Sequence, residues 1–196
     1  MPKDTFYNLS EEKKQKIYAA AVKEFSSRRF SEASINQIVK TAEIPRGSFY
    51  QYFEGKEDIY LYMFEQIGNG KRDAYDLTEI YDPEDDFAKF GLKAIKATFE
   101  WGKQHPEYIQ IAILMEIDDS SFIKGILSSI TDKFVEMLEH DKKRGLIRQE
   151  VDLALVGDML YTLIWKQFSL IGPDEKQYFK KVTEGFEIIR KGIAVK

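Results

Sequence analysis

Residues 34–56 read SINQIVKTAEIPRGSFYQYFEGK, a pattern that predicts two short helices joined by a tight turn. The first helix begins at Ser34, and Gln37 completes a capping box in which each side chain satisfies the other residue's backbone amide. Pro45 suits the first turn of the second helix, because its fixed φ is already helical. That helix is predicted to end near Phe53. The segment is therefore predicted to be a helix-turn-helix module.

The second of these helices has one apolar side and one small, polar side. At about 100° per residue, Phe49 and Phe53 share one side, which suits packing against a support. The other side carries Gly47, Ser48, Tyr50 and Gln51. Hydrogen-bonding groups on such a face, with a glycine that permits close approach, suit a helix that enters the major groove of DNA.

Two cations lie at helix starts in this module. Arg46 occupies the position where a base-contacting residue belongs. Lys56 opens the following helix, where a cation opposes the helix dipole by about 0.3–1 kcal/mol, a penalty that a phosphate partner would reverse. The neighbouring Glu57 and Asp58 partly offset that penalty.

The string PRGSFYQYFEGKEDIY, residues 45–60, follows a capped helix and resembles the signature of TetR-family transcriptional regulators. The similarity covers about Ser10 to Phe64, and beyond it the chain resembles the family only in helix pattern and length. The resemblance implies a three-helix DNA-binding head and a divergent helical ligand-binding body. It also implies homodimers that bind near-palindromic double-stranded operators and release them when a small molecule binds, most often as repressors.

Carried over by position, the resemblance makes Arg46 and Ser48 groove contacts and places Tyr50, Tyr52 and Lys56 on the phosphates. The full set of predicted DNA contacts is Ser34, Ile35, Asn36, Pro45, Arg46, Gly47, Ser48, Tyr50, Gln51, Tyr52 and Lys56. Surface cations and aromatic pairs usually have purely structural roles. The ordered combination of a capping box, a turn, Gly47 and Lys56 nevertheless favours DNA binding.

Two residues depart from the family pattern. Glu43 stands where the family usually has a turn glycine, and Pro45 where it often has a Ser or Thr cap. A non-glycine residue in left-handed geometry costs about 1–2 kcal/mol. Either the turn therefore has a different shape or Glu43 is mildly strained.

Helical periodicity continues from Ser10 to the end of the chain and predicts an all-α fold of about nine helices. We expect a DNA-binding domain at residues 1–65 and an effector-binding and dimerisation domain at 66–196, with the boundary least defined at 68–86. Helix caps are predicted at Ser10, Asp119–Ser121 and Asp152, helix ends at Gly145 and Gly172–Pro173, and a last helix over about Asp174 to Gly192.

The last two helices are predicted to form a homodimer interface. The final helix has an apolar seam at Phe179, Val182, Phe186, Ile189 and Ile193. The preceding helix is apolar on more than one side, with Val156 and Leu160 on one stripe and Leu155 and Met159 elsewhere. Two apolar faces favour pairing between two chains.

An apolar or aromatic effector of unknown identity is expected to bind in the C-terminal body. The predicted pocket residues are Phe99, Trp101, Tyr108, Met115, Phe122 and Trp165, although each one is also explained as core. We expect the effector to act by moving the helix that begins at Lys56.

Several other chemistries find no support in the sequence. With no cysteine and only His105 and His140, it offers no metal site, and no cofactor is expected. Gly55–Lys56 lacks the earlier glycine of a phosphate-binding loop, because position 50 is Tyr50. No apolar run suits a signal segment or a membrane span, so a soluble, cytoplasmic protein without a membrane partner is expected.

Charge distribution agrees with DNA binding, and two alternative functions stay open. Residues 1–72 contain 12 Lys and Arg against 10 Asp and Glu, whereas the remainder contains 17 against 23. A helical small-molecule-binding enzyme could use Glu100 or Glu116 with a raised pKa in a pocket. An effector-free DNA-binding protein is the second alternative, although it leaves the long aromatic-rich body unexplained.

Overall fold

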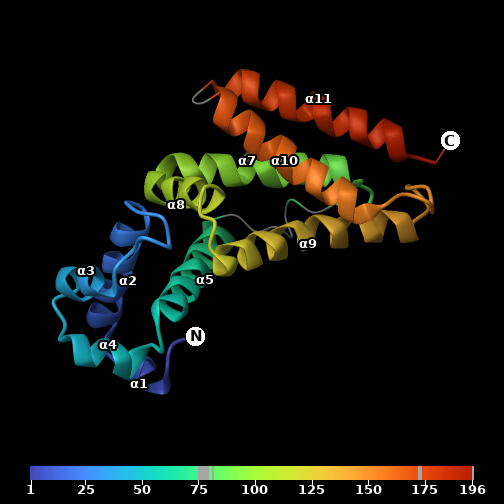
Figure 1. Ribbon diagram of the computed structural model, residues 1–196. Coiled ribbons are helices and arrows are strands. Elements are labelled where there is room, and N and C mark those ends of the chain that lie inside the picture. Colours follow the sequence, from blue (N-terminus) through green and yellow to red (C-terminus); the bar gives the residue numbers. More distant parts are fainter. Residues whose placement is uncertain (75–79, 81, 172–173, 196) are drawn as a thin grey trace. The chain divides into compact units, whose positions relative to one another are not determined.

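The computed structural model describes residues 1–74, 80, 82–171 and 174–195 (Figure 1). Over these ranges the regular secondary structure is helical, apart from one isolated bridge between Ile147 and Ala194. The helices are α1 (Asp4–Tyr7), α2 (Glu11–Phe25), α3 (Ile35–Thr41), α4 (Arg46–Tyr52), α5 (Lys56–Ala74), α7 (Phe87–Gln104), α8 (Pro106–Glu116), α9 (Ser121–Lys143), α10 (Leu153–Ile171) and α11 (Glu175–Ile193). The all-α prediction is confirmed, and every predicted helix is present.

Within the described ranges, no helix combines the length and the apolar character needed to cross a membrane. The predicted helix end at Gly172–Pro173 lies outside the described residues, as do positions 75–79 and 81 of the predicted boundary region.

The chain forms two compact units. The first comprises residues 1–75 and 98–125, and the second comprises residues 76–97 and 126–196. The first unit includes residues far along the chain because α8 packs against α2.

The first unit is built around buried aromatic and aliphatic side chains from its N-terminal helices. The predicted apolar stripe of α2 is buried, with Ile17 and Ala21 at 0% exposure. Further side chains in this core are Phe6, Phe25, Ile38, Phe49, Phe53, Ile59 and Met63. Burial of large apolar side chains such as these is the main stabilising contribution to a small helical domain.

Most of the predicted helix caps are confirmed. The Ser10 hydroxyl accepts a hydrogen bond from the Lys13 N–H. At the start of α11, where no cap was predicted, the Asp174 carboxylate accepts a hydrogen bond from the Gln177 N–H at 3.0 Å. Ser120 and Asp152 accept equivalent bonds at the starts of α9 and α10. Gly145, which follows α9, has φ of 76°, and this left-handed residue marks the end of the helix as predicted.

The capping box predicted at Ser34 and Gln37 is wrong. The Ser34 side chain makes no capping bond, and its backbone N–H instead donates to the carboxylate of Glu24 at 2.9 Å. Glu24 is only 5% exposed and reaches this amide from the preceding helix. Pro45 was predicted in the first turn of its helix, whereas it occupies the N-cap position, one residue before α4 begins at Arg46.

Helix α1 was not predicted, and it closes the C-terminal end of α4. The Lys3 N–H donates to the Tyr52 carbonyl at 2.8 Å, and the Lys3 ammonium donates to the Tyr50 carbonyl at 2.9 Å. The Thr5 hydroxyl donates to the Gln51 carbonyl. The N-terminal segment thus satisfies three carbonyls of the last turn of α4, where intrahelical donors are missing.

In the second unit, α10 and α11 run beside each other and pack closely (Figure 1). A Cβ atom added at Gly185 of α11 would lie 2.4 Å from a methyl group of Leu163, so the glycine permits the close approach. Val156, Leu160, Val182 and Phe186 are buried, which accounts for one apolar face of each helix.

Candidate nucleic-acid interface

Helices α3 and α4 are joined by a turn in which Glu43 takes the left-handed conformation. The Ile44 N–H donates to the Val39 carbonyl at 3.1 Å, and the Glu43 N–H donates to the Lys40 carbonyl at 3.3 Å. These are the two bonds of a Schellman motif, whose left-handed position usually belongs to glycine. Glu43 has φ of 55°. Of the two outcomes expected for this departure from the family pattern, the mildly strained glutamate is the one found.

Helix α4 separates its two sides as the sequence predicted. The rings of Phe49 and Phe53 are both 0% exposed and lie 5.3 Å apart between centroids. On the other side Arg46, Gly47, Tyr50 and Gln51 are exposed, and Ser48 is half-buried. Two buried rings therefore fix the orientation of a polar ridge, which we define as Arg46, Gly47, Ser48, Tyr50 and Gln51.

Gly47 leaves open space on this ridge. A Cβ atom built at this position has no other atom within 4 Å, so nothing in the described part of the chain requires the glycine. Glycine also disfavours the helix that contains it, by about 0.5–1 kcal/mol relative to alanine in a helix interior. A glycine that packing does not need is consistent with close approach by an external partner.

Two cations lie beside the turn without a carboxylate partner in the described part of the chain. Arg46 at the start of α4 and Lys40 in the last turn of α3 are exposed, and no carboxylate among the described residues pairs with either. Because each is hydrated and unpaired, a phosphate can bind there without first displacing a carboxylate. Lys40 was missed at the sequence level, since one exposed lysine in a helical pattern carries no distinguishing signal.

The Lys56 ammonium makes contacts within the protein that the sequence did not indicate. It donates to the carbonyls of Ala33 at 3.0 Å and Ser31 at 3.4 Å, and it lies 4.5 Å from the ring centroid of Phe30. The lysine thus fixes the segment that leads into α3. It keeps its net charge, because carbonyl groups do not neutralise it.

Tyr52 differs from the other predicted contacts because its ring is buried, with 6% exposure. The ring packs edge-on against Phe6, and its hydroxyl accepts a hydrogen bond from the Lys13 ammonium at 3.2 Å. Its position supports a structural role, and we leave it out of the ridge.

The remaining predicted contacts surround α3. Asn36 and Pro45 are exposed, whereas Ser34 and Ile35 are half-buried. Asn36 lies in the first turn of α3 and Pro45 immediately before α4. The turn therefore brings these residues to the same small module as the ridge.

The residues predicted to line an effector pocket fall into both units. Trp101 and Tyr108 line one cavity of the first unit, together with Tyr18 and Tyr62, which the sequence did not indicate. The other predictions lie elsewhere. Met115 is buried and Phe99 is half-buried. The ring of Phe122 packs on that of Phe30, with centroids 4.5 Å apart. Trp165 belongs to the second unit, where it contacts Tyr161 and Phe168.

The carboxylates considered for an enzymatic site are not buried. Glu100 and Glu116 are both exposed, and Glu100 pairs with Lys103 at 2.7 Å. Neither carboxylate is therefore enclosed in a pocket away from solvent. Across the described ranges, the protein has no group of three or more His, Asp or Glu side chains arranged to hold a metal ion.

Residues 17–63 match the family model described as "Bacterial regulatory proteins, tetR family". The HTH-type transcriptional regulator YdgC of Bacillus subtilis (strain 168) is 26% identical over 155 residues, which cover 78% of this chain and 77% of YdgC. The HTH-type transcriptional repressor NemR of Escherichia coli (strain K12) is 44% identical over 39 residues, 20% of each chain. The fold resembles that of a TetR family transcriptional regulator from Chloroflexus aurantiacus J-10-FL, with a TM-score of 0.66, 23% identity and full coverage of both chains.

Proposed function

We propose that this chain, a transcriptional regulator of the TetR family and not an enzyme, binds a near-palindromic DNA operator as a homodimer and releases it when a small molecule binds. The observation that carries the proposal is the polar ridge of α4, which is exposed and braced by two buried phenyl rings. A helix of this kind fits the major groove, where base edges offer distinct hydrogen-bonding patterns.

Positive charges on and beside the ridge also support DNA binding by this surface. Arg46 can form two hydrogen bonds to a guanine edge, which is the commonest specific contact in such grooves. Lys40 and Lys56 keep positive charge beside the ridge and can approach phosphates. Binding that depends on such contacts weakens as salt rises, because counterions are released from DNA when the complex forms.

The homodimer is supported by an unpaired face on the second unit. Leu155 and Met159 of α10 are 58% and 48% exposed, and Ile188 of α11 is 71% exposed. They line a groove of about 570 Å³ along the two helices. Other apolar side chains of these helices, such as Val156 and Val182, are already buried within the single chain, so a second copy of the chain is the occupant that the sequence pattern favours.

Opposite charges on this groove suit twofold pairing. Asp158 and Lys166 both line it, are both exposed, and lie two helical turns apart on α10. If two copies of α10 pack in opposite directions, the carboxylate of one copy faces the ammonium of the other. Such rim pairs contribute little affinity but help to fix the register.

A repressor is the simplest regulator of this design, since occupying the operator excludes the transcription machinery. NemR, a relative that is 44% identical over 39 residues, is named as a repressor. An effector then needs only to bind the DNA-free conformation more tightly than the DNA-bound one.

Selection of duplexes from a random pool tests the proposed function. At low salt, the full-length protein should enrich sequences with two inverted half-sites whose centres lie about one helical turn, 34–36 Å, apart. The unselected pool is the control for non-specific retention. If no sequence is enriched over that pool, or if only single half-sites are recovered, the proposed operator binding by a homodimer is wrong.

A further inference from the structure

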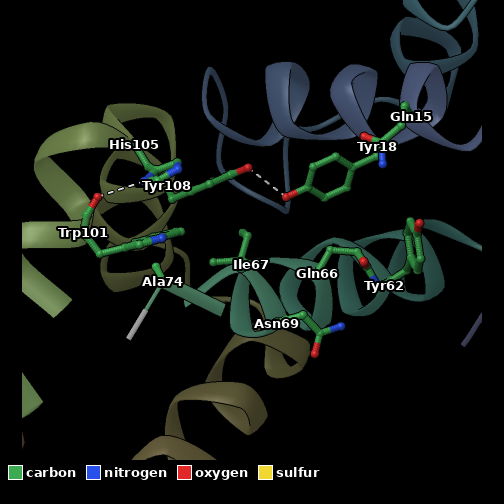
Figure 2. Close-up of a pocket in the computed structure, with 11 residues that line it drawn as sticks. Gln15, Tyr18, Tyr62, Gln66, Ile67, Asn69, Ala74, Trp101, His105 and Tyr108 are labelled. Carbon is green, nitrogen blue, oxygen red and sulfur yellow. Dashed lines mark hydrogen bonds between the residues drawn. The ribbon is translucent and has the colours of Figure 1, made fainter. Parts of the chain in front are cut away.

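The first unit contains a cavity of about 500 Å³ that no part of the proposed DNA interface uses. It is bounded by α2, α5 and the segment where α7 meets α8, and Figure 2 shows side chains from all of them facing it. Its volume lies within the range of about 300–1,000 Å³ that is typical of small-molecule sites. The cavity belongs to the same compact unit as the helix-turn-helix module.

One wall of the cavity is a set of nearly parallel aromatic rings. Trp101 and His105 stack with centroids 4.1 Å apart and planes inclined by 17°. Trp101 and Tyr108 stack at 5.2 Å and 8°. The His105 Nδ1 donates to the Trp101 carbonyl at 2.9 Å, which fixes the orientation of the imidazole ring. A wall of fixed, parallel rings favours a flat aromatic guest.

The other walls are polar but uncharged. Gln15, Gln66 and Asn69 line them, together with Tyr18 and Tyr62 (Figure 2). No Asp, Glu, Lys or Arg is among the described residues that line the cavity. Burial raises the pKa of both Tyr18 and Tyr62, so the two phenols stay neutral. Such walls offer hydrogen bonds to a neutral molecule, and the nearby Lys71 ammonium lies 5.2 Å from the centroid of the Trp101 ring.

Across this cavity, the hydroxyls of Tyr18 and Tyr108 form a hydrogen bond of 2.9 Å (Figure 2). Tyr18 belongs to α2 of the helix-turn-helix module, and Tyr108 lies in the first turn of α8. Beyond the far end of α8, the Asp118 carboxylate accepts a hydrogen bond from the Ser31 N–H at 2.7 Å. Helix α8 is therefore fixed to the DNA-binding module at both ends.

We propose that this cavity binds a neutral, flat aromatic molecule carrying a hydroxyl or carbonyl group, and that the molecule separates Tyr18 from Tyr108. The guest stacks on the ring of Trp101 or Tyr108, and its polar group takes the place of one phenol in the pair. Loss of the bond frees α8 from α2 at one end. This regulatory consequence rests on the proposed function, whereas the binding site itself does not.

Two glycines of α5 provide a matched test of the site. Gly70 lines the cavity, and a Cβ atom there would lie 4.0 Å from the Trp101 ring, an ordinary contact. Gly70→Leu therefore fills the cavity without strain. Gly68→Leu is the control, because Gly68 is on the same helix but does not line the cavity. Gln66→Trp fills the cavity from one turn earlier and serves as a second blocking variant.

Isothermal titration calorimetry with 2-naphthol measures binding in the absence of DNA. We expect saturable binding to the wild type and to Gly68→Leu, and binding weakened by about tenfold or more in Gly70→Leu and Gln66→Trp. Circular dichroism verifies that each variant is folded. Equal 2-naphthol binding by the folded blocking variants, or no binding by the wild type, would overturn the site.

The regulatory consequence is measured separately, by fluorescence anisotropy with a selected operator duplex. Saturating 2-naphthol should lower DNA affinity about tenfold for the wild type and Gly68→Leu, but not for Gly70→Leu. Tyr108→Phe, which removes the hydroxyl pair, should lower DNA affinity without any ligand. Binding of 2-naphthol with unchanged DNA affinity would overturn the coupling. If the ligand-free protein binds no duplex at all, the proposed function fails, and the calorimetry still decides the site.

Discussion

Among single residues, Gly47 supports the proposed DNA interface because it has no side chain. Gly47 sits in the first turn of α4, and open space surrounds the position of its absent Cβ. Packing within the protein therefore gives no reason for glycine there. Contact with a groove does give one, because a base edge or backbone that approaches within van der Waals distance leaves no room for a methyl group.

Gly47→Ala should separate stability from DNA binding. We expect the free energy of unfolding to rise by about 0.5 kcal/mol, because alanine favours the helix, while operator affinity falls about tenfold through steric conflict. Urea denaturation and fluorescence anisotropy measure the two effects. Gly125→Ala in α9 is the control, since its Cβ also meets no atom within 4 Å and it lies far along the chain from α4. Unchanged DNA affinity in Gly47→Ala would remove the close-approach argument.

Single residues also show where sequence reasoning succeeds and fails. At Glu43 the sequence left two outcomes open, a differently shaped turn or a mildly strained residue, and the left-handed φ of 55° is the second of them. The cap at Ser34 failed, because Glu24 of α2 supplies the interaction that a capping box would supply. A local motif cannot anticipate a competing partner from another helix.

At the scale of elements, α8 is the helix that links the cavity to the DNA-binding module. Its C-terminal anchor is Asp118, which is 4% exposed and accepts hydrogen bonds from the N–H groups of Ser31 and Ser120. Burial alone would raise the pKa of Asp118, but the hydrogen bonds from Ser120 and Ser31 outweigh it and lower the pKa to about 2. The carboxylate is therefore charged in the folded protein even in mild acid.

Asp118→Asn should destabilise the protein in a pH-dependent manner. The folded pKa lies below the ordinary value of 3.8, so the ionised group contributes stability above about pH 4 and loses it as the pH falls toward 2. We expect the variant to be about 2 kcal/mol less stable than the wild type at pH 7, with the difference shrinking in acid. Urea denaturation at several pH values measures it. A difference that does not change with pH would contradict the assigned role.

Elements differ in how well periodicity finds them. Every long helix was predicted, because apolar spacing of three and four residues repeats over several turns and caps mark the starts. Helix α1 has four residues and no repeat, so periodicity gives no signal for it. The Tyr18–Tyr108 contact joins residues 90 positions apart, and no spacing rule reaches that far. The cavity was therefore only partly predicted, through Trp101 and Tyr108.

At the scale of the whole molecule, the proposed homodimer can be tested through α11. Ile188→Glu places a charge on the exposed apolar face and should convert the protein to a monomer, because a buried unpaired carboxylate is strongly disfavoured. Thr183→Glu is the control, since Thr183 is exposed about 140° around the same helix. Sedimentation equilibrium measures the mass. A wild type that is already monomeric, or an Ile188→Glu variant that still pairs, would contradict the proposed interface.

DNA binding by the ridge of α4 is tested most directly by the operator affinity of Arg46→Ala. By fluorescence anisotropy at low salt, Arg46→Ala should lose about 1–3 kcal/mol of binding free energy and accept other bases at one position of each half-site. Lys124→Ala, which removes an exposed cation of α9, should bind within about twofold of the wild type. Equal affinity and equal base preference in Arg46→Ala and the wild type would contradict the account.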